Sequence, residues 1–525
     1  MRILFSVRNP WYVRHYDSVL RHLAADGHHI DLVADGLGRA AIWPASVAAL
    51  VEAWPSIRLH WTPAPAGQPW YELGTRLRQS LYFLRFFQSA YHGMPALLRR
   101  AEEKAPRWAV RLARTPLLPP AVRLSLVAAI LRRLERAVPP SHDIAAFLGT
   151  LAPDVVVLTP LIVLRTVQLD LLRSARAVGI PTVFGVASWD HLSSKGVLWT
   201  VPDRVVVWNA IQRAEAVRLH DVPEDRVQVT GAQLFDDWFA EPSHRTHEEF
   251  CGAVGLDPRR PYVLWVCSAL FEGSPIEAAF VARWVEAVRS SGSPLLREAG
   301  ILIRPHPRRA DEWKTVDLSG FDNVVLHPAD GASPVDDETR RDYYDALRHA
   351  GAVVGLNTSA MVEAAILRRP VLSILLPGFR PNQEGTVHFR YLMDDADGVL
   401  ECSRSLEAHV RQLDEVLRRD AGAPSPRSDR FVAQFIRPLG RTVTATPLVA
   451  SAVTDAAATH PAPQRVSVVD RLLRPLLYPF ALGAARGARS RMAARHAEKA
   501  ARRAGKAARR REASGRPPRP VGPAA

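Results

Sequence analysis

Short apolar runs that alternate with amphipathic helical segments are the feature that most constrains this chain. The first run, residues 3–7, precedes a helical segment with apolar residues at Val19, Leu20 and Leu23. That segment ends at Gly27 and leads into a second apolar run, residues 30–34. A strand, a helix and a strand within about thirty residues open a doubly wound parallel sheet. The sequence therefore predicts an α/β fold from its first elements onward.

The same alternation forms two series along the chain. After the opening, apolar runs typical of buried strands recur at 155–158, 182–184, 204–208 and 227–230, and then at 262–266, 301–303, 324–326, 352–355 and 371–376. A polar stretch at 241–249 separates the two series and is interpreted as the linker. We therefore expect two Rossmann-like doubly wound parallel-sheet domains, over residues 1–243 and 244–440. A length of 525 residues fits two or three domains.

A region rich in Leu, Arg and Ala, at about 70–140, interrupts the first series. We expect it to be a helical insertion in the first domain. Its aromatic cluster at 81–87 has the spacing of a buried helical stripe, and a lipid-facing or substrate-facing stripe is the alternative.

The positive charge lies at one end of the chain. Residues 465–525 hold 16 Lys and Arg against 3 Asp and Glu. The rest of the chain holds 52 basic and 50 acidic residues, so it contributes only +2 to the net charge of +15. So little excess charge over the first 464 residues argues against a nucleic-acid-binding body. Residues 441–525 are interpreted as a linker rich in Ala, Thr and Pro, followed by a basic tail that is partly helical or disordered, with Pro475 and Pro479 interrupting its apolar part.

The basic tail predicts contact with an anionic membrane surface through residues 465–525, because each basic residue near such a surface contributes roughly 1 kcal/mol. A solvated disordered tail and an RNA-binding tail are the alternatives. No run approaches 18 uninterrupted apolar residues, and the apolar start is too short for a signal peptide. Cys251, Cys267 and Cys402 have no metal-ligand spacing and fit a reducing compartment. We expect a cytoplasmic protein that can lie peripherally on the inner face of the plasma membrane.

The sequence Arg-Pro-His-Pro directly follows an apolar run and contains Arg304 and His306. Ligands of open parallel sheets bind at the carboxyl ends of the strands. The prolines restrict the backbone, so the guanidinium and the imidazole are held ready for an anion such as a phosphate. An ordinary surface loop is the alternative.

A second strand end leads through Asn357, Thr358 and Ser359 into a helical segment that contains Glu363. A capped helix start offers free amide groups to an anion, and a carboxylate one turn further on can accept hydrogen bonds from a ribose. Simple helix capping explains the same residues without a ligand. In the third such loop, Gln383 is an amide suited to sugar hydroxyl groups, or only part of a polar loop.

The first domain offers candidates after the strand at 182–184. Trp189 can stack on a sugar, Asp190 or His191 can take a proton, and Lys195 can meet an anionic group. The loop after the first strand adds Arg8 and His15, and His15 competes with Asp190 as the base. His15 could equally be an exposed helical residue. Gly231 follows another strand and is expected near the hinge.

Together these elements resemble GT-B glycosyltransferases over about residues 1–440, without the helical insertion. The Arg-Pro-His-Pro element is similar to that of bacterial capsule and surface-polysaccharide transferases, of the CDP-glycerol glycerophosphotransferase and Kdo-transferase type. The resemblance implies that His306, Thr358 and Ser359 bind donor phosphate, that Glu363 binds the ribose, and that the loop at Gly231 approaches the nucleotide. An acidic motif ending in Asp-Gly, found in sialyltransferases, is not evident, which argues against CMP-sialic acid as the donor.

We therefore expect a metal-independent transferase that needs no cofactor. Its second domain would bind a nucleotide-activated donor through Arg304, His306, Asn357 and the neighbouring residues named above. Its first domain would bind a surface-polysaccharide or lipid-linked glycan acceptor, with Asp190 or His15 as the catalytic base. Two alternatives remain: a non-hydrolysing UDP-sugar 2-epimerase-like enzyme, and a non-catalytic scaffold with the same fold.

Overall fold

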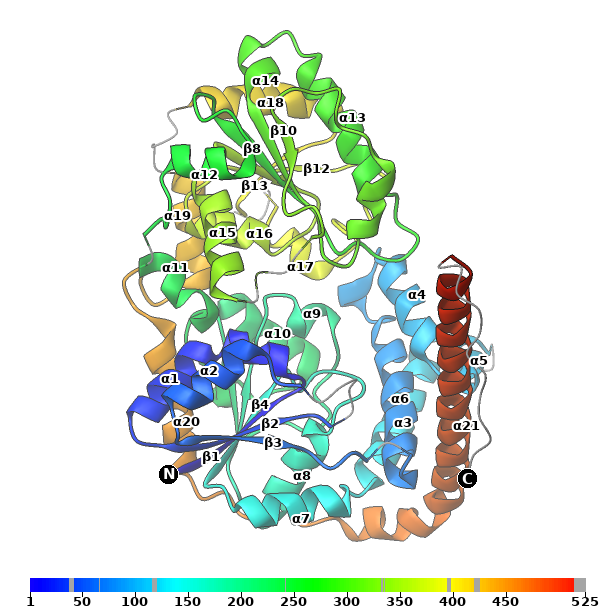
Figure 1. Cartoon of the computed structure of the whole chain (residues 1–525). Helices are drawn as coiled ribbons and strands as arrows, with labels where there is room; N and C mark the ends of the chain where they lie inside the picture. Colours follow the sequence, from blue (N-terminus) through cyan, green and yellow to red (C-terminus); the bar gives the residue numbers. More distant parts are fainter. Residues whose placement is uncertain are drawn as a thin grey trace.

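Two parallel sheets form the body of the molecule, the first in the lower half of Figure 1 and the second in the upper half. The computed structural model describes residues 1–36, 42–65, 67–115, 120–240, 242–331, 334, 336–393, 398–419 and 425–513. Helices cover both faces of each sheet. The prediction of two doubly wound parallel-sheet domains is confirmed.

The first sheet has seven strands in the order β3-β2-β1-β4-β5-β6-β7. Their bounds are β1 Arg2–Val7, β2 His29–Ala34, β3 Ile57–Trp61, β4 Val155–Thr159, β5 Thr182–Gly185, β6 Arg204–Val207 and β7 Val227–Val229. One face is covered by α1 Asp17–Ala25, α2 Ala45–Ala53 and α20 Ala445–Ala457, and the other by α7 His142–Leu151, α8 Gln168–Val178 and α10 Ala210–His220. The strand order reverses between β1 and β4, where a ligand is expected.

The second sheet repeats this plan with six strands in the order β10-β9-β8-β11-β12-β13. Their bounds are β8 Tyr262–Val266, β9 Gly300–Arg304, β10 Val324–Leu326, β11 Ala352–Gly355, β12 Val371–Ile374 and β13 Leu400–Ser403. One face holds α12 His247–Val254, α15 Asp337–Arg348, α16 Ala360–Ile366 and α19 Pro426–Phe431, and the other α13 Glu277–Arg289, α14 Pro294–Glu298 and α18 Leu406–Arg418. The order reverses between β8 and β11.

The insertion is helical, as expected, and consists of α3 Pro69–Arg85, α4 Pro95–Lys104, α5 Arg107–Arg114 and α6 Pro120–Ala137. Three of the four helices begin with proline, whose fixed φ suits the first helical position. Most of the aromatic cluster is buried in a core of its own, which confirms the core interpretation. Glu135 of α6 accepts hydrogen bonds from Arg78 of α3 at 2.9 Å and from Arg173 of α8 at 2.7 Å, and this buried bridge fixes the insertion to the first domain.

The interpretation of the residues after 440 as a linker needs a correction, because part of this stretch is a buried helix. Ala445–Ala457 forms α20, whose Val449, Val453 and Ala456 are buried in the core of the first domain. The chain therefore crosses between the domains twice. The two crossings are joined at Asp236, whose carboxylate accepts hydrogen bonds from Arg437 at 3.0 Å and from the backbone amide of Thr446 at 2.7 Å.

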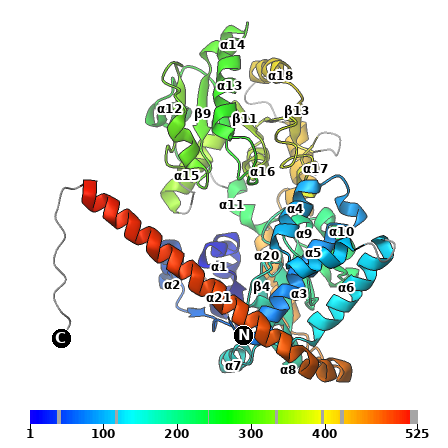
Figure 2. The same ribbon diagram turned by 90° about the vertical axis from the view of Figure 1, so that its right-hand side faces the viewer.

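The basic tail forms a single long helix, α21 Val468–Ala513, which runs along α3 and α6 (Figures 1 and 2). Pro475 and Pro479 lie inside this helix and do not end it. In Figure 2 its C-terminal part projects beyond the body of the molecule. No helix among the described residues is both long and apolar enough to span a bilayer.

Candidate functional site

The loop after β1 brings polar side chains to the carboxyl edge of the first sheet. It folds into a short 3-10 helix, Pro10–His15, which begins at Asn9 because the side chain of Asn9 accepts a hydrogen bond from the amide of Trp11 at 3.1 Å. The rings of Tyr12 and His15 lie side by side, with 5.4 Å between their centroids. His15 is therefore held at the switch point of the first sheet and is not an exposed helical residue.

The loop after β5 adds an ion pair to the same edge. The Asp190 carboxylate lies 2.7 Å from Lys195 Nζ and accepts a hydrogen bond from the Ser188 hydroxyl at 2.8 Å. Burial opposes the ionisation of Asp190, but the neighbouring Lys195 ammonium outweighs it and holds the pKa of Asp190 well below the usual range. Asp190 thus pairs with Lys195 in this structure, and its role as the catalytic base stays a prediction.

Further cations gather around this ion pair. Burial lowers the pKa of Lys104 on α4, and Arg100, Lys195 and Arg8 lower it further. The charge of Arg14 lowers the pKa of the neighbouring His15 imidazole and that of Glu363 in the second domain. We call Arg8, Arg14, Arg100, Lys104 and Lys195 the cation cluster. Such an excess of positive charge at a strand edge favours an anionic ligand.

The second domain faces this cluster directly. The Trp189 indole donates a hydrogen bond to Ser359 Oγ at 3.3 Å, and its ring lies edge to face with that of His388 at 4.8 Å. Trp189 is buried, so it bridges the domains and is not an open platform for a sugar. Asn357 donates a hydrogen bond to the Asn382 carbonyl, and its Nδ2 lies 3.5 Å from His388 Nε2. The edges of the two sheets therefore meet at one cleft.

Three imidazoles at this cleft are uncharged at neutral pH. Burial lowers the pKa of both His191 and His388 to about 4. Burial, together with Arg14 and His191, holds the pKa of His15 well below its usual value. The Nδ1 atom of each ring is buried and has no hydrogen-bond partner among the described residues. Neutral imidazoles can accept a proton from a bound hydroxyl group.

The start of α16 does not follow the expected capping pattern. Ser359 makes no side-chain cap, and Thr358 Oγ1 accepts only a long hydrogen bond, 3.4 Å, from the Ala360 amide. Glu363 is half-buried and accepts a hydrogen bond from the Tyr343 hydroxyl. Burial raises its pKa, while Arg14 across the cleft lowers it. Glu363 therefore faces the cleft with one internal partner already in place.

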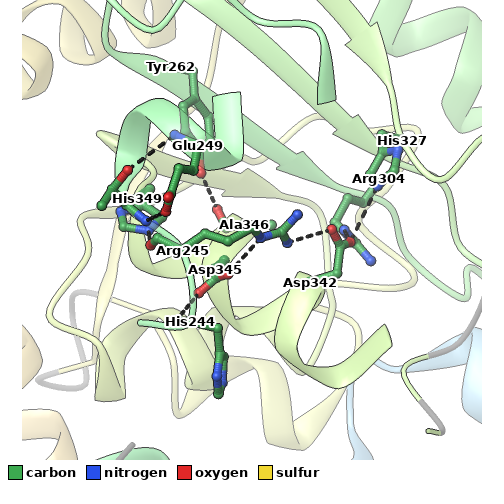
Figure 3. A network of polar contacts seen from close by, with 11 residues as sticks. His244, Arg245, Glu249, Tyr262, Arg304, His327, Asp342, Asp345, Ala346 and His349 are labelled. Carbon is green, nitrogen blue, oxygen red and sulfur yellow. Dashed lines mark hydrogen bonds and ion pairs between the residues drawn. The ribbon is translucent and has the colours of Figure 1, made fainter. Parts of the chain in front are cut away.

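Arg304 serves the fold, which corrects its prediction as a donor-phosphate ligand. Its guanidinium is buried and lies 2.8 Å from the Asp342 carboxylate, which also binds Arg245 at 2.9 Å (Figure 3). Burial opposes the ionisation of Asp342, but hydrogen bonds from His327, Arg304 and Arg245 hold its pKa far below its usual value. The charge of Arg304 is already compensated inside the second domain.

His306 lies in the loop after β9, one strand away from the switch point of the second sheet. Its Nδ1 accepts a hydrogen bond from the Arg308 amide at 3.1 Å. Burial, with Arg308 and Arg309, lowers its pKa to about 4, so it is neutral at physiological pH. Contact between His306 and a donor phosphate stays a prediction.

Gln383 and Gly231 also have structural roles. The Gln383 amide is fully buried and donates hydrogen bonds to the carbonyl groups of Leu356 and Ile374, each at 3.0 Å, so it joins the ends of β11 and β12. A Cβ placed at Gly231 would come within 3.1 Å of the Ile436 carbonyl, which favours glycine at this position. Contact of Gln383 or Gly231 with the donor stays a prediction.

Sequence reasoning missed several residues of the cleft. Arg100 and Lys104 belong to the insertion, in which no site residue was predicted, and the Arg100 guanidinium lies 4.1 Å from the centre of the Phe271 ring of the second domain. His388 follows the polar loop that contains Gln383. Single cations and imidazoles are too frequent in this chain to identify a site by themselves. Within the described ranges, no group of three or more His, Cys, Asp or Glu side chains is arranged to hold a metal ion.

Comparisons with known proteins give similarity of arrangement only. No family model matches the chain, and no curated protein matches its sequence. Among solved structures, UDP-GlcNAc 2-epimerase from Neisseria meningitidis bound to UDP-GlcNAc is 12% identical, with a TM-score of 0.48 over 87% of this chain and 100% of that one. WaaG, a glycosyltransferase involved in lipopolysaccharide biosynthesis, is 13% identical (TM-score 0.43, 86% and 98%), and the wall teichoic acid polymerase TagF is 9% identical (0.43, 87% and 89%). These TM-scores lie below 0.5, so the fold assignment rests on the strand orders of the two sheets.

Proposed function

We propose that this chain is a glycosyltransferase or glycerophosphotransferase-like enzyme of the GT-B type. It would move a group from a nucleotide-activated donor to a surface-polysaccharide or lipid-linked glycan acceptor at the cytoplasmic side of the membrane. The observation that carries the proposal is the cation cluster at the edge of the first sheet, opposite Asn357, Ser359 and Glu363 of the second. A phosphate-rich substrate between two such edges matches the charge of one and the hydrogen-bonding groups of the other.

In this proposal the nucleotide lies on the second domain. Glu363 would accept hydrogen bonds from the ribose, and Asn357, Thr358, Ser359 and His306 would contact the phosphates. The cation cluster would bind the same phosphates from the opposite side and stabilise the negative charge that develops as the nucleotide leaves. This differs from the sequence-based expectation, in which Arg304 supplied the charge.

His15 is the proposed base. Its imidazole is neutral, lies at the switch point of the first sheet and has a buried Nδ1 without a hydrogen-bond partner among the described residues. It would take the proton of the acceptor hydroxyl while that oxygen attacks the reacting carbon or phosphorus of the donor. The bond to the nucleotide breaks, and the nucleotide phosphate takes the electron pair. The reaction needs no metal or cofactor in this proposal.

The test has two steps. First, thermal unfolding is measured with CMP, CDP, UDP and GDP and with their common sugar or glycerol conjugates. Binding at 100 times the dissociation constant adds about 2.7 kcal/mol of stability, so we expect one nucleotide class to raise the melting temperature clearly. If no nucleotide does so, the transferase proposal fails and the non-catalytic scaffold is favoured.

Second, nucleotide release is measured with and without a glycan acceptor. His15→Ala should lower acceptor-dependent release by about 10²–10⁴-fold and leave the nucleotide-induced melting shift in place. His22→Ala is the matched control, because His22 lies on the neighbouring α1 with a partly exposed side chain paired to Asp26. Conversion of a UDP-sugar to its 2-epimer without an acceptor would instead identify the 2-epimerase alternative.

A further inference from the structure

The outer face of α21 is apolar where the outer face of a packed helix is normally polar. Val469, Leu472, Leu476 and Phe480 follow one another at intervals of three and four residues, and the last three are each 68% exposed. At 1.5 Å per residue this row is about 17 Å long. The opposite face of the same helix is already used, because Leu477 and Ala481 are buried in the core of the insertion.

The orientation of α21 is fixed by polar contacts as well as by packing. Arg474 donates a hydrogen bond to the Ala137 carbonyl at 3.1 Å, and Asp470 lies 3.3 Å from Arg133 of α6. At the other end of the packed part, Arg489 donates to the Gly67 carbonyl at 3.2 Å. The apolar row therefore cannot turn inward without breaking these contacts.

Apolar side chains are also exposed on α6, which packs against α21, and on α5, which packs against α6. Leu126 and Ile130 of α6 are each 50% exposed, and Trp108 and Leu112 of α5 are more than 40% exposed. In both helices the two residues are four positions apart and therefore share one face. Exposed apolar residues that recur on three neighbouring helices mark an interaction surface more strongly than scattered ones.

Exposed basic residues lie on the same three helices. The exposed arginines of the three helices include Arg107, Arg111, Arg132, Arg136 and Arg471. Beyond Phe480, the sequence of α21 continues with eleven Lys and Arg against two Glu, up to Ala513. A face of this charge repels a second copy of itself and attracts an anionic layer.

We infer that the outer faces of α5, α6 and the first part of α21 dock the protein on an anionic lipid bilayer. The apolar row of α21 inserts at the boundary between headgroups and acyl chains, and the arginines contact the lipid phosphates. In this inference a preformed apolar surface makes the membrane contact. Basic charge alone would allow contact at any point along the tail. The inference stands independently of the transferase reaction.

The experiment measures co-sedimentation of the full chain with vesicles of phosphatidylcholine alone and of phosphatidylcholine mixed with phosphatidylglycerol. We expect binding to the anionic vesicles, and at least about tenfold weaker binding for the triple variant Leu472→Ser, Leu476→Ser and Phe480→Ser, because three apolar side chains leave the lipid. Val178→Ser and Ile276→Ser are matched controls, since these residues are similarly exposed on α8 and beside α13. Both controls should bind like the parent chain.

Two results would overturn the inference. Unchanged binding of the triple variant, together with complete loss of binding at high salt, would show that tail charge alone holds the protein. A parent chain that is dimeric in solution and becomes monomeric in the triple variant would show that the face binds a second copy. Melting temperatures of all variants confirm folding, and no nucleotide is present, so the result is separate from that of the turnover test.

A second readout reports insertion directly. Phe480→Cys, made in a Cys402→Ser background because Cys402 is partly exposed whereas Cys251 and Cys267 are buried, is labelled with an environment-sensitive dye. The emission should shift to shorter wavelength on anionic vesicles, and a label at Ile276→Cys should not respond. Equal responses at both positions would contradict docking through α21.

Discussion

The carboxyl edges of the two sheets have the same plan and opposite chemistry. Each sheet reverses its strand order at one point, between β1 and β4 in the first and between β8 and β11 in the second. A buried glutamine joins two strand ends in each sheet: Gln168 joins β1 to β4 at the reversal, and Gln383 joins β11 to β12, one strand beyond it. The first edge then carries the cation cluster, whereas the second carries amides, hydroxyl groups and Glu363. The fold therefore places the site, and the side chains from surrounding segments decide which edge handles negative charge.

The largest expected effect concerns one buried carboxyl group beneath each edge. Burial raises the pKa of Asp35 to about 7 and that of Glu277 to about 8. Because each folded-state pKa exceeds the unfolded value, the native state binds more protons and stability falls as pH rises, from about 4 to 7 for Asp35 and from about 4.5 to 8 for Glu277. Each loss amounts to about 4 kcal/mol.

Asp35→Asn should remove the part of the stability loss that occurs between about pH 4 and 7. Glu277→Gln should remove the part that continues to about pH 8. Urea unfolding at a series of pH values measures both. If the two variants keep the pH dependence of the parent chain, these carboxyl groups are not the source, and the two edges do not share this feature.

The next effect separates a structural arginine from a site arginine. Arg304→Gln leaves Asp342 with fewer partners in a partly buried network and should lower the free energy of unfolding by about 3 kcal/mol. Arg100→Gln should change stability by less than about 0.5 kcal/mol and weaken binding of the nucleotide-activated donor about tenfold, most clearly at low salt. Isothermal titration and urea unfolding test the pair. Reversed results would restore Arg304 as a ligand.

The two glutamines provide a smaller test of the shared plan. Gln168 exchanges three backbone hydrogen bonds, with Ser6, Thr159 and Leu161, whereas Gln383 donates to two backbone carbonyl groups. At about 1 kcal/mol per bond, Gln168→Leu should cost about 3 kcal/mol and Gln383→Leu about 2 kcal/mol in urea unfolding. Losses of unfolding free energy below about 0.5 kcal/mol would mean that the strand ends keep their positions without the two glutamines.

The smallest effect concerns the contact between the edges. The hydrogen bond from Trp189 to Ser359 is long, so Trp189→Phe and Ser359→Ala, measured singly and together, should show a coupling energy of about 0.5–1 kcal/mol. Fully additive effects would indicate that the two edges are held together by packing around His388 alone.

The sequence allowed the fold to be predicted wherever a strand is buried on both faces. β3 and β13 escaped prediction because they lie at sheet edges and carry polar residues such as Arg58 and Glu401. α20 was missed because its small residues resemble a linker, although Ala and Val fit closely against a sheet.

The site was predictable only in part. The loops at strand ends predicted His15, Asn357 and Glu363 as site residues, and the structure places all three where the two sheet edges face each other. Their roles in binding and catalysis stay predictions. The compensation of Arg304 depends on Asp342, whose approach is a tertiary contact that local sequence does not encode. The cation cluster combines three separate segments, and one of them is the insertion.

The double crossing at Asp236 has a consequence for synthesis on the ribosome. The first domain is complete only when α20 is added to its core, and α20 follows the entire second domain in the sequence. At about 5–20 residues per second, that domain takes roughly 10–40 s to emerge. During that interval the nascent first domain exposes the apolar sheet surface that Val449 and Val453 later cover, which makes it a binding site for chaperones in the cell.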